Sequence, residues 1–348
     1  MKQPGPRSGS HQGKTSRRLP EGQGRSPDST PSPSRRIRRF AVDTESIQCI
    51  PGWNIQCLQI TAGELAGYSV DLHLPHIQVL FEEFRNVTTN HFGCAPAGSI
   101  SFGVARGMKG AGLLNGVAWR DGVSAFDTRR ELDSIVPPMH LVSVVVNRQV
   151  LSEYVWHTEH ADLEHWLSEG PAVVNDASLA TRLGERLHAL QSTDPGSVPS
   201  LRAPAVRRSL QHGVLEILGP LVSDRLRADK TVRRELAHLQ VVRRAREYLR
   251  ERSDDPPRVL DLCRVLGVSR RWLQQSFNEV LGIGPLAYLR FMRLGGARRM
   301  LSSGTAGMRV RDAVEAFGFW HLSRFSHDYR HLFGELPSET LRRVRALD

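Results

Sequence analysis

Short runs of apolar residues, several of them alternating with polar ones, follow each other between residues 40 and 165. In the segment Ser69-Val70-Asp71-Leu72-His73-Leu74 every second side chain is apolar, which is the period of a β-strand buried on one face. Glycine and proline residues separate the runs and mark turns. Repeated short strands at this spacing predict a β-sandwich or barrel. The expected strands are Trp53–Ile60, Tyr68–Leu74, Ile77–Phe84, Ser99–Ala105, Leu113–Trp119 and Leu141–Val146.

From about His160 to Ala228 the pattern becomes that of helices. Two amphipathic helices are expected there. The second, over Val206 to Arg227, follows a segment rich in proline and serine. The pattern leaves open whether these helices pack within the chain or against a second subunit, so a homodimer remains one of two alternatives. The first helix is marked by leucines that recur every three or four residues, at Leu179, Leu183, Leu187 and Leu190.

Two segments within residues 236–345 repeat each other. Apolar, glycine and proline positions recur together, with one residue inserted in the second turn, and such a match predicts a duplicated structural unit. The positions Val259, Asp261, Leu262, Gly267, Val268, Leu273, Phe277, Gly282, Pro285, Leu289 and Arg290 match Val310, Asp312, Ala313, Gly318, Phe319, Phe325, Tyr329, Gly334, Pro337, Leu341 and Arg342.

Each copy has the pattern of a helix, a tight glycine turn and a second helix. In the first copy Gly267 suits a left-handed turn, and Ser269 is a good N-cap for the helix that follows. This is the helix-turn-helix arrangement, whose second helix enters the DNA major groove. Between the copies, Pro285 to Leu301 predicts a helix of about 17 residues, roughly 25 Å long, which suits two recognition helices near one ~34 Å DNA turn apart.

The exposed side of each second helix carries side chains that can read bases. Arginine can bond guanine and glutamine can bond adenine, each through two hydrogen bonds. A solvated helix face is the plain alternative for one such helix, but two copies in a basic domain favour DNA contact. The predicted DNA-binding residues are Arg270, Arg271, Gln274 and Gln275 in the first copy and Ser323, Arg324 and His327 in the second.

The net charge of +11 is concentrated at the two ends of the chain. Residues 1–39 and residues 236–348 each carry a net charge of +8, whereas residues 40–235 carry −5. A basic segment attached to an acidic body is typical of a nucleic-acid binder. Residues 1–39 are also rich in serine, proline and glycine, so we expect a disordered basic tail there.

Other classes of function find no support in the sequence. A chain of 348 residues is long enough for two or three folded units. No run of apolar residues approaches the length needed to span a membrane. The basic N-terminus is not followed by an apolar segment, so no secretory signal is expected. The cysteines are far apart, which fits a cytoplasmic protein without disulfides or a zinc site. Neither an HxH pair nor a P-loop, GxGxxG, GxSxG or HExxH motif occurs, so we expect no metal, no cofactor and no catalytic residue.

The C-terminal 110 residues resemble the AraC/XylS transcription regulators, whose DNA-binding domain is two helix-turn-helix units joined by a long helix. The resemblance implies base or backbone contacts at Arg271, Gln274, Gln275, Ser323, Arg324 and His327, and it implies RNA polymerase as a partner. Departures from the family pattern are Trp320, His327 and Leu341. The residues that carry the resemblance are Gly318-Phe319 through Phe325-Ser326, Tyr329-Arg330, Phe333-Gly334 and Pro337-Ser338.

The N-terminal region more weakly resembles regulators of the ethanolamine-utilisation type, through Trp53, Gly63 to Gly67 and Leu72 to Pro75. The resemblance implies a cupin-like or related β domain that senses a small molecule or mediates dimerisation. Aromatic residues of the strands are candidates to line an effector pocket, although strand aromatics often serve only the core. The candidates are Trp53, Phe102 and Trp119.

Together these patterns predict a multidomain α+β protein. We expect a disordered basic tail over 1–39, a β-rich sensing or dimerisation domain over 40–165, a helical linker over 166–235 and an all-α double helix-turn-helix domain over 236–345. The predicted function is a cytoplasmic, sequence-specific regulator of transcription that binds double-stranded DNA, with an effector-responsive activator as the first hypothesis. The alternative is an effector-independent or architectural DNA-binding protein whose β domain only dimerises.

Overall fold

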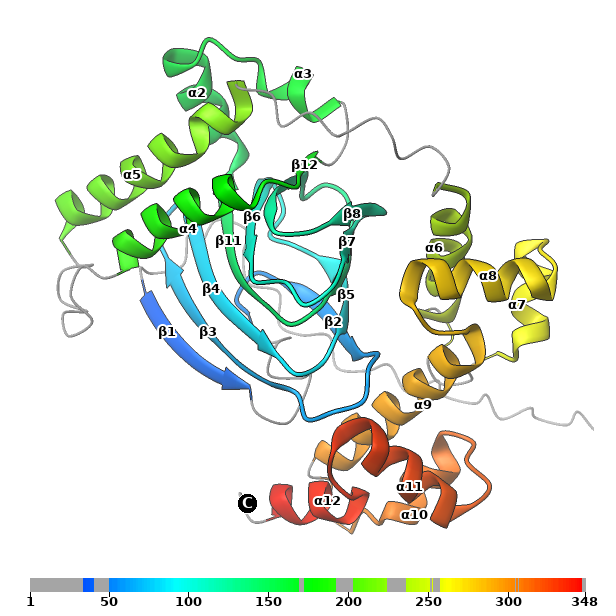
Figure 1. Cartoon of the computed structure of the whole chain (residues 1–348). Coiled ribbons are helices and arrows are strands. Elements are labelled where there is room, and N and C mark those ends of the chain that lie inside the picture. Colours follow the sequence, from blue (N-terminus) through cyan, green and yellow to red (C-terminus); the bar gives the residue numbers. More distant parts are fainter. Residues whose placement is uncertain are drawn as a thin grey trace, which may run out of the picture. The chain divides into compact units, whose positions relative to one another are not determined.

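The computed structural model describes residues 34–40, 50–168, 172–191, 203–223, 236–250, 252, 257–303, 305 and 307–345 (Figure 1). Most of the tail predicted over residues 1–39 lies outside these residues, as do parts of the predicted linker. Residues 34–39, in contrast, belong to strand β1 (Ser34–Phe40), which pairs antiparallel with β3 (Ala66–His73). Composition alone cannot predict this pairing, because the exposed edge of a sheet accepts a strand through backbone hydrogen bonds.

Two antiparallel sheets form the β domain that the alternating pattern predicts. The larger sheet has the strand order β1-β3-β4-β11-β6-β9-β12, and the smaller has the order β2-β5-β10-β7-β8. The remaining strands of the larger sheet are β4 (Ile77–Arg85), β6 (Ser99–Arg106), β9 (Gly122–Asp127), β11 (Met139–Asn147) and β12 (Ala172–Val174). Those of the smaller sheet are β2 (Asn54–Gln59), β5 (Thr89–Cys94), β7 (Gly112–Leu114), β8 (Val117–Trp119) and β10 (Leu132–Val136).

The run expected as one strand over Leu113–Trp119 is a hairpin instead. Strands β7 and β8 pair antiparallel across Asn115 and Gly116, which have φ values of 46° and 88°. Asparagine followed by glycine is the preferred pair for a two-residue turn with positive φ at both positions. The apolar run concealed this turn, because leucine and valine stand directly on both sides of it.

The larger sheet buries both of its faces, because successive side chains of a strand point to opposite sides. In β11, Val142 and Val144 face a core shared with helices, whereas Leu141 faces a second core between the two sheets. The chain therefore has a helix-covered outer face and an enclosed space between the sheets. This second core includes Ile55 and Val136 of the smaller sheet.

Helices cover the outer face of the larger sheet (Figure 1). They begin at Arg148, earlier than the sequence pattern predicts, because Asn147 caps the first helix by accepting a hydrogen bond from the Val150 N–H. The buried residues Leu187 and Leu218 join the core of the sheet, so both expected helices pack within the chain. The helices are α2 (Arg148–Thr158), α3 (Leu163–Ser168), α4 (Ala177–Gln191) and α5 (Pro204–Ser223).

The C-terminal region is entirely helical where the structure describes it, as the repeat predicts. Its helices form two cores, one for each copy of the repeat. The fold class predicted from the sequence, a β-rich domain followed by an all-α domain, is therefore confirmed. The helices are α6 (Leu236–Arg250), α7 (Val259–Leu266), α8 (Arg270–Leu281), α9 (Pro285–Ser302), α10 (Val310–Ala316), α11 (Leu322–Phe333) and α12 (Pro337–Arg345).

Helix α9 belongs to both of these cores. Tyr288 and Leu289, near its start, pack with the first copy, and Leu294 and Leu301 pack with the second. At Gly296 the helix approaches the second copy so closely that a Cβ atom would lie 2.2 Å from the Phe317 ring. A glycine is therefore required at position 296 because any larger side chain would collide with Phe317, and not because the backbone conformation excludes other residues.

The two adjacent glycines of α9 provide a matched test of this contact. Gly296→Ala is expected to lower the free energy of unfolding by about 1–3 kcal/mol, because the Phe317 ring must move out of a packed core. Gly295→Ala is the control, since its Cβ would meet only the ends of two flexible side chains, Leu58 at 3.3 Å and Arg299 at 3.8 Å. Urea unfolding of the two full-length variants measures the difference, and equal stability would contradict the proposed close contact.

Candidate nucleic-acid interface and β-domain cavity

The first helix-turn-helix unit consists of α7, a glycine turn and α8. Gly267 adopts the left-handed conformation, with φ 67°, and its N–H bonds the last turn of α7. Ser269 then caps α8, where its Oγ accepts a hydrogen bond of 3.1 Å from the Trp272 N–H. Leu273 and Phe277 are fully buried and fix the orientation of α8 on its neighbours. The opposite side of α8 is thereby presented to solvent.

All four DNA-binding residues predicted in the first unit lie on this exposed side. Gln274 donates to Asn278 at 3.2 Å and Gln275 donates to Glu279 at 2.8 Å, so both amides are held along the helix. Arg270 and Arg271 occupy the first turn of α8 and are also exposed. The face combines two cations with two amides, which is suitable chemistry for phosphates and base edges.

Trp272, which the sequence analysis did not single out, shapes the other border of α8. Its ring lies 4.3 Å from the ring of His238 on α6, centroid to centroid. The same histidine is 2.9 Å from the Ser276 Oγ and 3.2 Å from the Glu279 carboxylate. Helix α6 therefore packs against α8 through His238. Its apolar spacing was visible in the sequence, but this polar contact needed the structure.

The second unit repeats the arrangement with α10 and α11. Gly318 has the same left-handed conformation as its counterpart, with φ 67°. His321 is the N-cap residue of α11, and its side chain makes no capping hydrogen bond. Ser323, Arg324 and His327 are exposed on α11, so the predicted residues of the second unit also share a solvent face.

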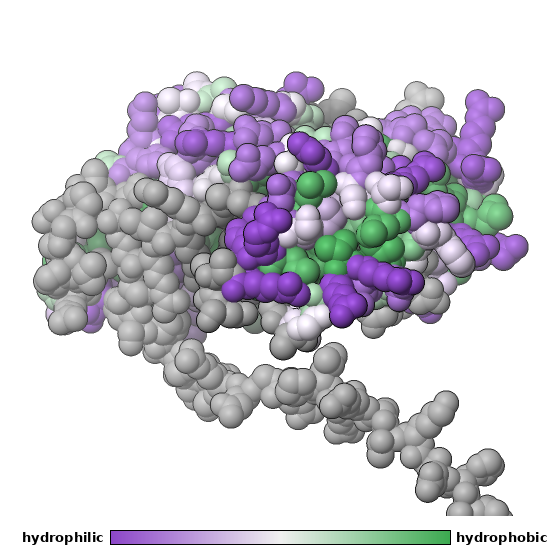
Figure 2. Space-filling view, turned by 90° about the horizontal axis from the view of Figure 1, so that it is seen from below, coloured by the Kyte–Doolittle hydropathy of each residue, from purple (hydrophilic) through white to green (hydrophobic). Residues whose placement is uncertain are grey.

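Large apolar side chains are exposed mainly around these units. Contiguous exposed apolar surface commonly marks a contact site. Figure 2 shows one face of the molecule on which apolar residues gather in one area surrounded by hydrophilic ones. Trp320, at the start of the second unit's recognition helix, is 93% exposed. In the described helical region the exposed large apolar residues are Leu260, Val265, Trp272, Leu286, Trp320 and Leu322.

Known proteins match this part of the chain. Residues 262–343 match a family described as a helix-turn-helix domain. Over 105 residues the chain is 37% identical to a probable thc operon regulatory protein of Rhodococcus erythropolis, which covers 30% of this chain and 32% of that protein. Over 85 residues it is 36% identical to an XylDLEGF operon transcriptional activator of Pseudomonas putida, which covers 24% of this chain and 26% of that protein. The matched residues therefore form a helix-turn-helix domain of the AraC/XylS type.

A solved structure also aligns with the AraC-type domain. A probable AraC family transcriptional regulator from Rhodopseudomonas palustris is 35% identical, over 30% of this chain and 97% of that chain, with a TM-score of 0.29. The chain spans about a third of the length of the curated relatives it matches. Those relatives are named as regulators of transcription rather than as enzymes.

The second unit of the AraC-type domain is fixed to α9 through Glu335. This carboxylate accepts hydrogen bonds from Arg298 of α9 at 2.9 Å, from Arg343 of α12 at 2.6 Å and from the Thr340 hydroxyl at 2.7 Å. Burial alone would raise the pKa of Glu335, but the hydrogen bonds from Arg343 and Thr340 and the charge of Arg298 hold it below its usual value. Because Arg298 is only 4% exposed, this pairing anchors α12 and the preceding loop to the long helix.

The two N-caps of the AraC-type domain differ in a way that can be measured. Ser269→Ala is expected to lower stability by about 1 kcal/mol, because the Trp272 N–H loses its acceptor. His321→Asp is expected to raise stability by about 0.5–1 kcal/mol, because a carboxylate would supply the missing cap at a helix N-terminus. Urea unfolding of both variants tests the pair, and a loss of stability in His321→Asp would contradict it.

The space between the two sheets of the β domain encloses a cavity of about 60 Å³. Two of the aromatic residues proposed for an effector pocket, Trp53 and Trp119, line it. Phe102 does not, because it points to the outer face of the larger sheet, where its ring stacks on Trp166 at 6.1 Å. The neighbouring residue Gly103 faces the cavity, as the alternation of β6 requires.

Two titratable groups in the wall of this cavity have shifted pKa values. Burial raises the pKa of Glu82 to about 7, and a hydrogen bond from Ser143 at 3.4 Å opposes the shift only in part. Burial also lowers the pKa of His91 to about 4, so its imidazole is neutral at pH 7 and bonds Thr89 at 2.9 Å. Neither residue was found by the sequence analysis, because only the strand register places both in one cavity.

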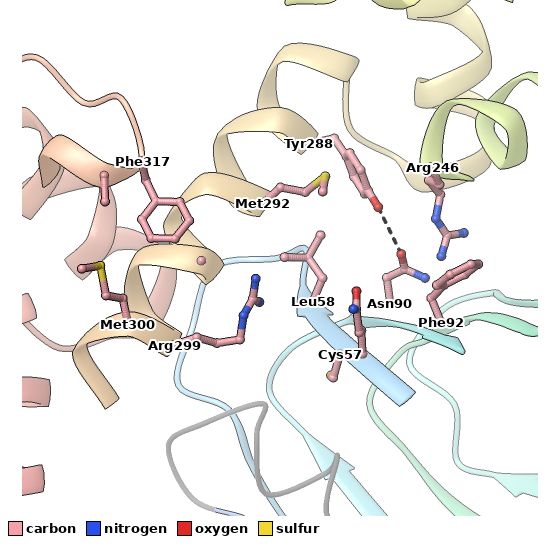
Figure 3. Close-up of a pocket in the computed structure, with 13 residues that line it drawn as sticks. Cys57, Leu58, Asn90, Phe92, Arg246, Tyr288, Met292, Arg299, Met300 and Phe317 are labelled. Carbon is pink, nitrogen blue, oxygen red and sulfur yellow. Dashed lines mark hydrogen bonds between the residues drawn. The ribbon is translucent and has the colours of Figure 1, made fainter. Parts of the chain in front are cut away.

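A larger cavity, of about 620 Å³, lies between strand residues and residues of α6 and α9 (Figure 3). The Tyr288 hydroxyl donates to the Asn90 side-chain oxygen across it, at 3.4 Å. Arg246, which also lines it, pairs with Asp133. In the described residues no three histidine, cysteine, aspartate or glutamate side chains form a group that could hold a metal. None of the described helices is long and apolar enough to cross a membrane.

The shifted pKa of Glu82 makes the stability of the β domain depend on pH. Since the pKa in the fold lies above its ordinary value of 4.5, the ionised carboxylate destabilises the fold above about pH 7, and the effect fades as pH falls towards 4.5. Glu82→Gln is therefore expected to raise the free energy of unfolding by about 3 kcal/mol at pH 8. At pH 5 the gain should be small.

Urea unfolding at the two pH values measures this difference. Glu83→Gln, on the same strand but with an exposed Arg85 as its partner, is the matched control and should show no such gain at pH 8. An equal effect of Glu82→Gln at pH 5 and pH 8 would show that the carboxylate is not held out of water.

Proposed function

We propose that this protein is an effector-responsive transcription activator that binds double-stranded DNA through two successive major grooves. The observation that carries the proposal is that α8 and α11 each expose a polar face while α9 joins their two cores. Helix α9 has 18 residues and is therefore about 27 Å long, which is close to the ~34 Å spacing of grooves on one side of DNA.

The exposed side chains divide the work of binding between affinity and specificity. Arginines of the domain contact phosphates and supply salt-sensitive affinity. Arg271 and Gln275 of α8 and Arg324 of α11 contact base edges, where a bidentate pair discriminates by about 1–3 kcal/mol. The name of one relative, an operon transcriptional activator, supports activation. RNA polymerase as a partner rests on the family resemblance alone. The enclosed cavity beside Trp53 and Trp119 supports the effector-responsive part.

Binding to DNA from upstream of the protein's own gene and its neighbours tests this function. Arg271→Ala and Arg324→Ala are each expected to reduce the preference for the target over unrelated DNA by about 1–3 kcal/mol, because each removes a base contact. Fluorescence anisotropy at two salt concentrations separates this loss from a general loss of phosphate contacts.

Arg243→Ala is the matched control, since Arg243 is an exposed arginine of the same domain that lies on α6 and pairs with Glu247 at 3.0 Å. It should leave the preference unchanged. Salt-sensitive binding that is indifferent to sequence and to both recognition-helix variants would overturn the proposal. Such binding would favour the effector-independent alternative, or simple attraction by the basic tail.

A further inference from the structure

The cavity of the β domain has an unusually polar floor for the interior of a small sandwich, which side chains such as leucine and valine commonly fill. Ser143 on β11, Gly103 on β6 and Ser124 on β9 are direct neighbours in the strand register. They form a continuous row of small residues across three strands, which are about 4.8 Å apart. This row leaves room above the sheet rather than filling it.

An acidic group stands at one end of this row without a cation. Glu82, on the next strand β4, is 8% exposed and accepts a hydrogen bond from Ser143. No lysine or arginine is among the described residues that line the cavity. Buried carboxylates are ordinarily paired with a positive charge or well supplied with hydrogen-bond donors. The site therefore lacks a donor-rich, positively charged group near Glu82.

An unpartnered donor lies over the middle of the row, beside Gly103. Trp119 is 3% exposed, and its indole Nε1 has no hydrogen-bond partner. A Cβ atom on Gly103 would lie 3.4 Å from the Trp119 ring, so the indole lies directly over the glycine. Because the indole N–H can only donate, it requires an acceptor oxygen or nitrogen. Leaving such a buried donor without an acceptor is costly.

The size of the cavity limits what can satisfy both groups. A volume of about 60 Å³ accommodates about four to six water-sized atoms, since one water needs about 10–15 Å³. Strands β4 and β6 lie on either side of β11, so their backbones are about 10 Å apart. Glu82 projects from β4, and the Trp119 ring lies over Gly103 of β6, so a molecule of about five non-hydrogen atoms placed above β11 matches the separation of the two groups. The rings of Trp53 and Phe126 line the same space, and the face of an aromatic ring attracts a cation.

We propose that this cavity binds a small primary ammonium compound of about five non-hydrogen atoms that also carries an oxygen acceptor. The ammonium group lies against Glu82 and Ser143, and the oxygen accepts the Trp119 Nε1 hydrogen. This inference rests on the proposed function, because such a compound would be the effector of the regulator. Binding to the cavity can nevertheless be measured without DNA.

The proposal implies a dependence of binding on pH. Burial and the nearby charge of Asp71 raise the pKa of Glu82 to about 7, so the carboxylate is mostly ionised at pH 8 and mostly protonated at pH 6. A primary amine stays protonated over this range. His91, which faces the same cavity from β5, is neutral throughout because burial lowers its pKa to about 4. Binding is therefore expected to be roughly tenfold tighter at pH 8 than at pH 6.

Four small probes of similar size test the chemistry on the full-length protein. The probe 2-methoxyethylamine carries both an ammonium group and an ether oxygen. Butylamine lacks the oxygen, 2-methoxyethanol lacks the charge, and methoxyacetate is an anion. Isothermal titration calorimetry and tryptophan fluorescence are expected to show binding of 2-methoxyethylamine at least tenfold tighter than that of any other probe. Equal binding of 2-methoxyethanol, or no binding of any probe, would overturn the proposal and leave a cavity that holds water only.

Two isosteric variants locate the site. Glu82→Gln should abolish the pH dependence and weaken 2-methoxyethylamine at least tenfold, while Trp119→Phe should make 2-methoxyethylamine bind no better than butylamine. Glu83→Gln and Trp156→Phe are the matched controls: Glu83 pairs with Arg85 instead of lining the cavity, and Trp156 is 62% exposed. Circular dichroism establishes that each variant is folded. Unchanged binding in both cavity variants would overturn the assignment.

The outcomes for the two proposals are distinct. If 2-methoxyethylamine binds as expected but upstream DNA is not recognised, the cavity proposal stands and the proposed function fails. If DNA is recognised and no probe binds, the proposed DNA-binding function stands and the ligand proposal fails.

Discussion

The proposed recognition of two grooves depends on a single element, helix α9. Its first part is buried with Tyr288 and Leu289 in one core, and its second part is buried with Leu294 and Leu301 in the other. The two recognition helices are each packed on one of these cores. A displacement of either helix along α9 would expose apolar side chains of that core, so the distance between the exposed faces of α8 and α11 is a property of the packing rather than of a linker.

In the β domain, as in α9, a single element contributes to two cores: the larger sheet packs with the helices on one face and with the smaller sheet on the other. The alternation of side chains along β11 sends valines towards the covering helices and Leu141 and Ser143 towards the second sheet. The outer core is continuous and apolar, and it can supply most of the stability of the domain. The inner face can therefore tolerate small and polar residues, including Glu82, whose burial is unfavourable in itself.

The sequence allowed a good prediction of the helical domain and a partial one of the β domain. The repeat preserves Gly267 and Gly318 together with its apolar positions. These positions set the geometry of the helices and turns, which depends mostly on the sequence of each segment itself. The exposed sides of the recognition helices follow from the same periodicity. The turn at Asn115 and Gly116 was also readable in principle, but the apolar residues on both sides concealed it.

The cavity was beyond the reach of sequence reasoning, because it depends on register between strands distant in the chain. Aromatic residues could be recognised as candidates, but not assigned to a face. Phe102 and Gly103 are adjacent in the chain and lie on opposite sides of the sheet, so only the smaller residue contributes to the cavity. The proximity of Glu82 to Ser143 likewise arises from pairing between β4 and β11.

The length of α9 also determines a rotation. A helix turns by about 100° per residue, so the residues of α9 that pack with the first unit, Tyr288 and Leu289, and those that pack with the second, Leu294 and Leu301, lie on different sides of the helix. One added residue would shift the second unit by only about 1.5 Å but would turn it by about 100° relative to the first. An insertion or deletion in α9 would therefore disturb the rotation between the two units more than the distance between them.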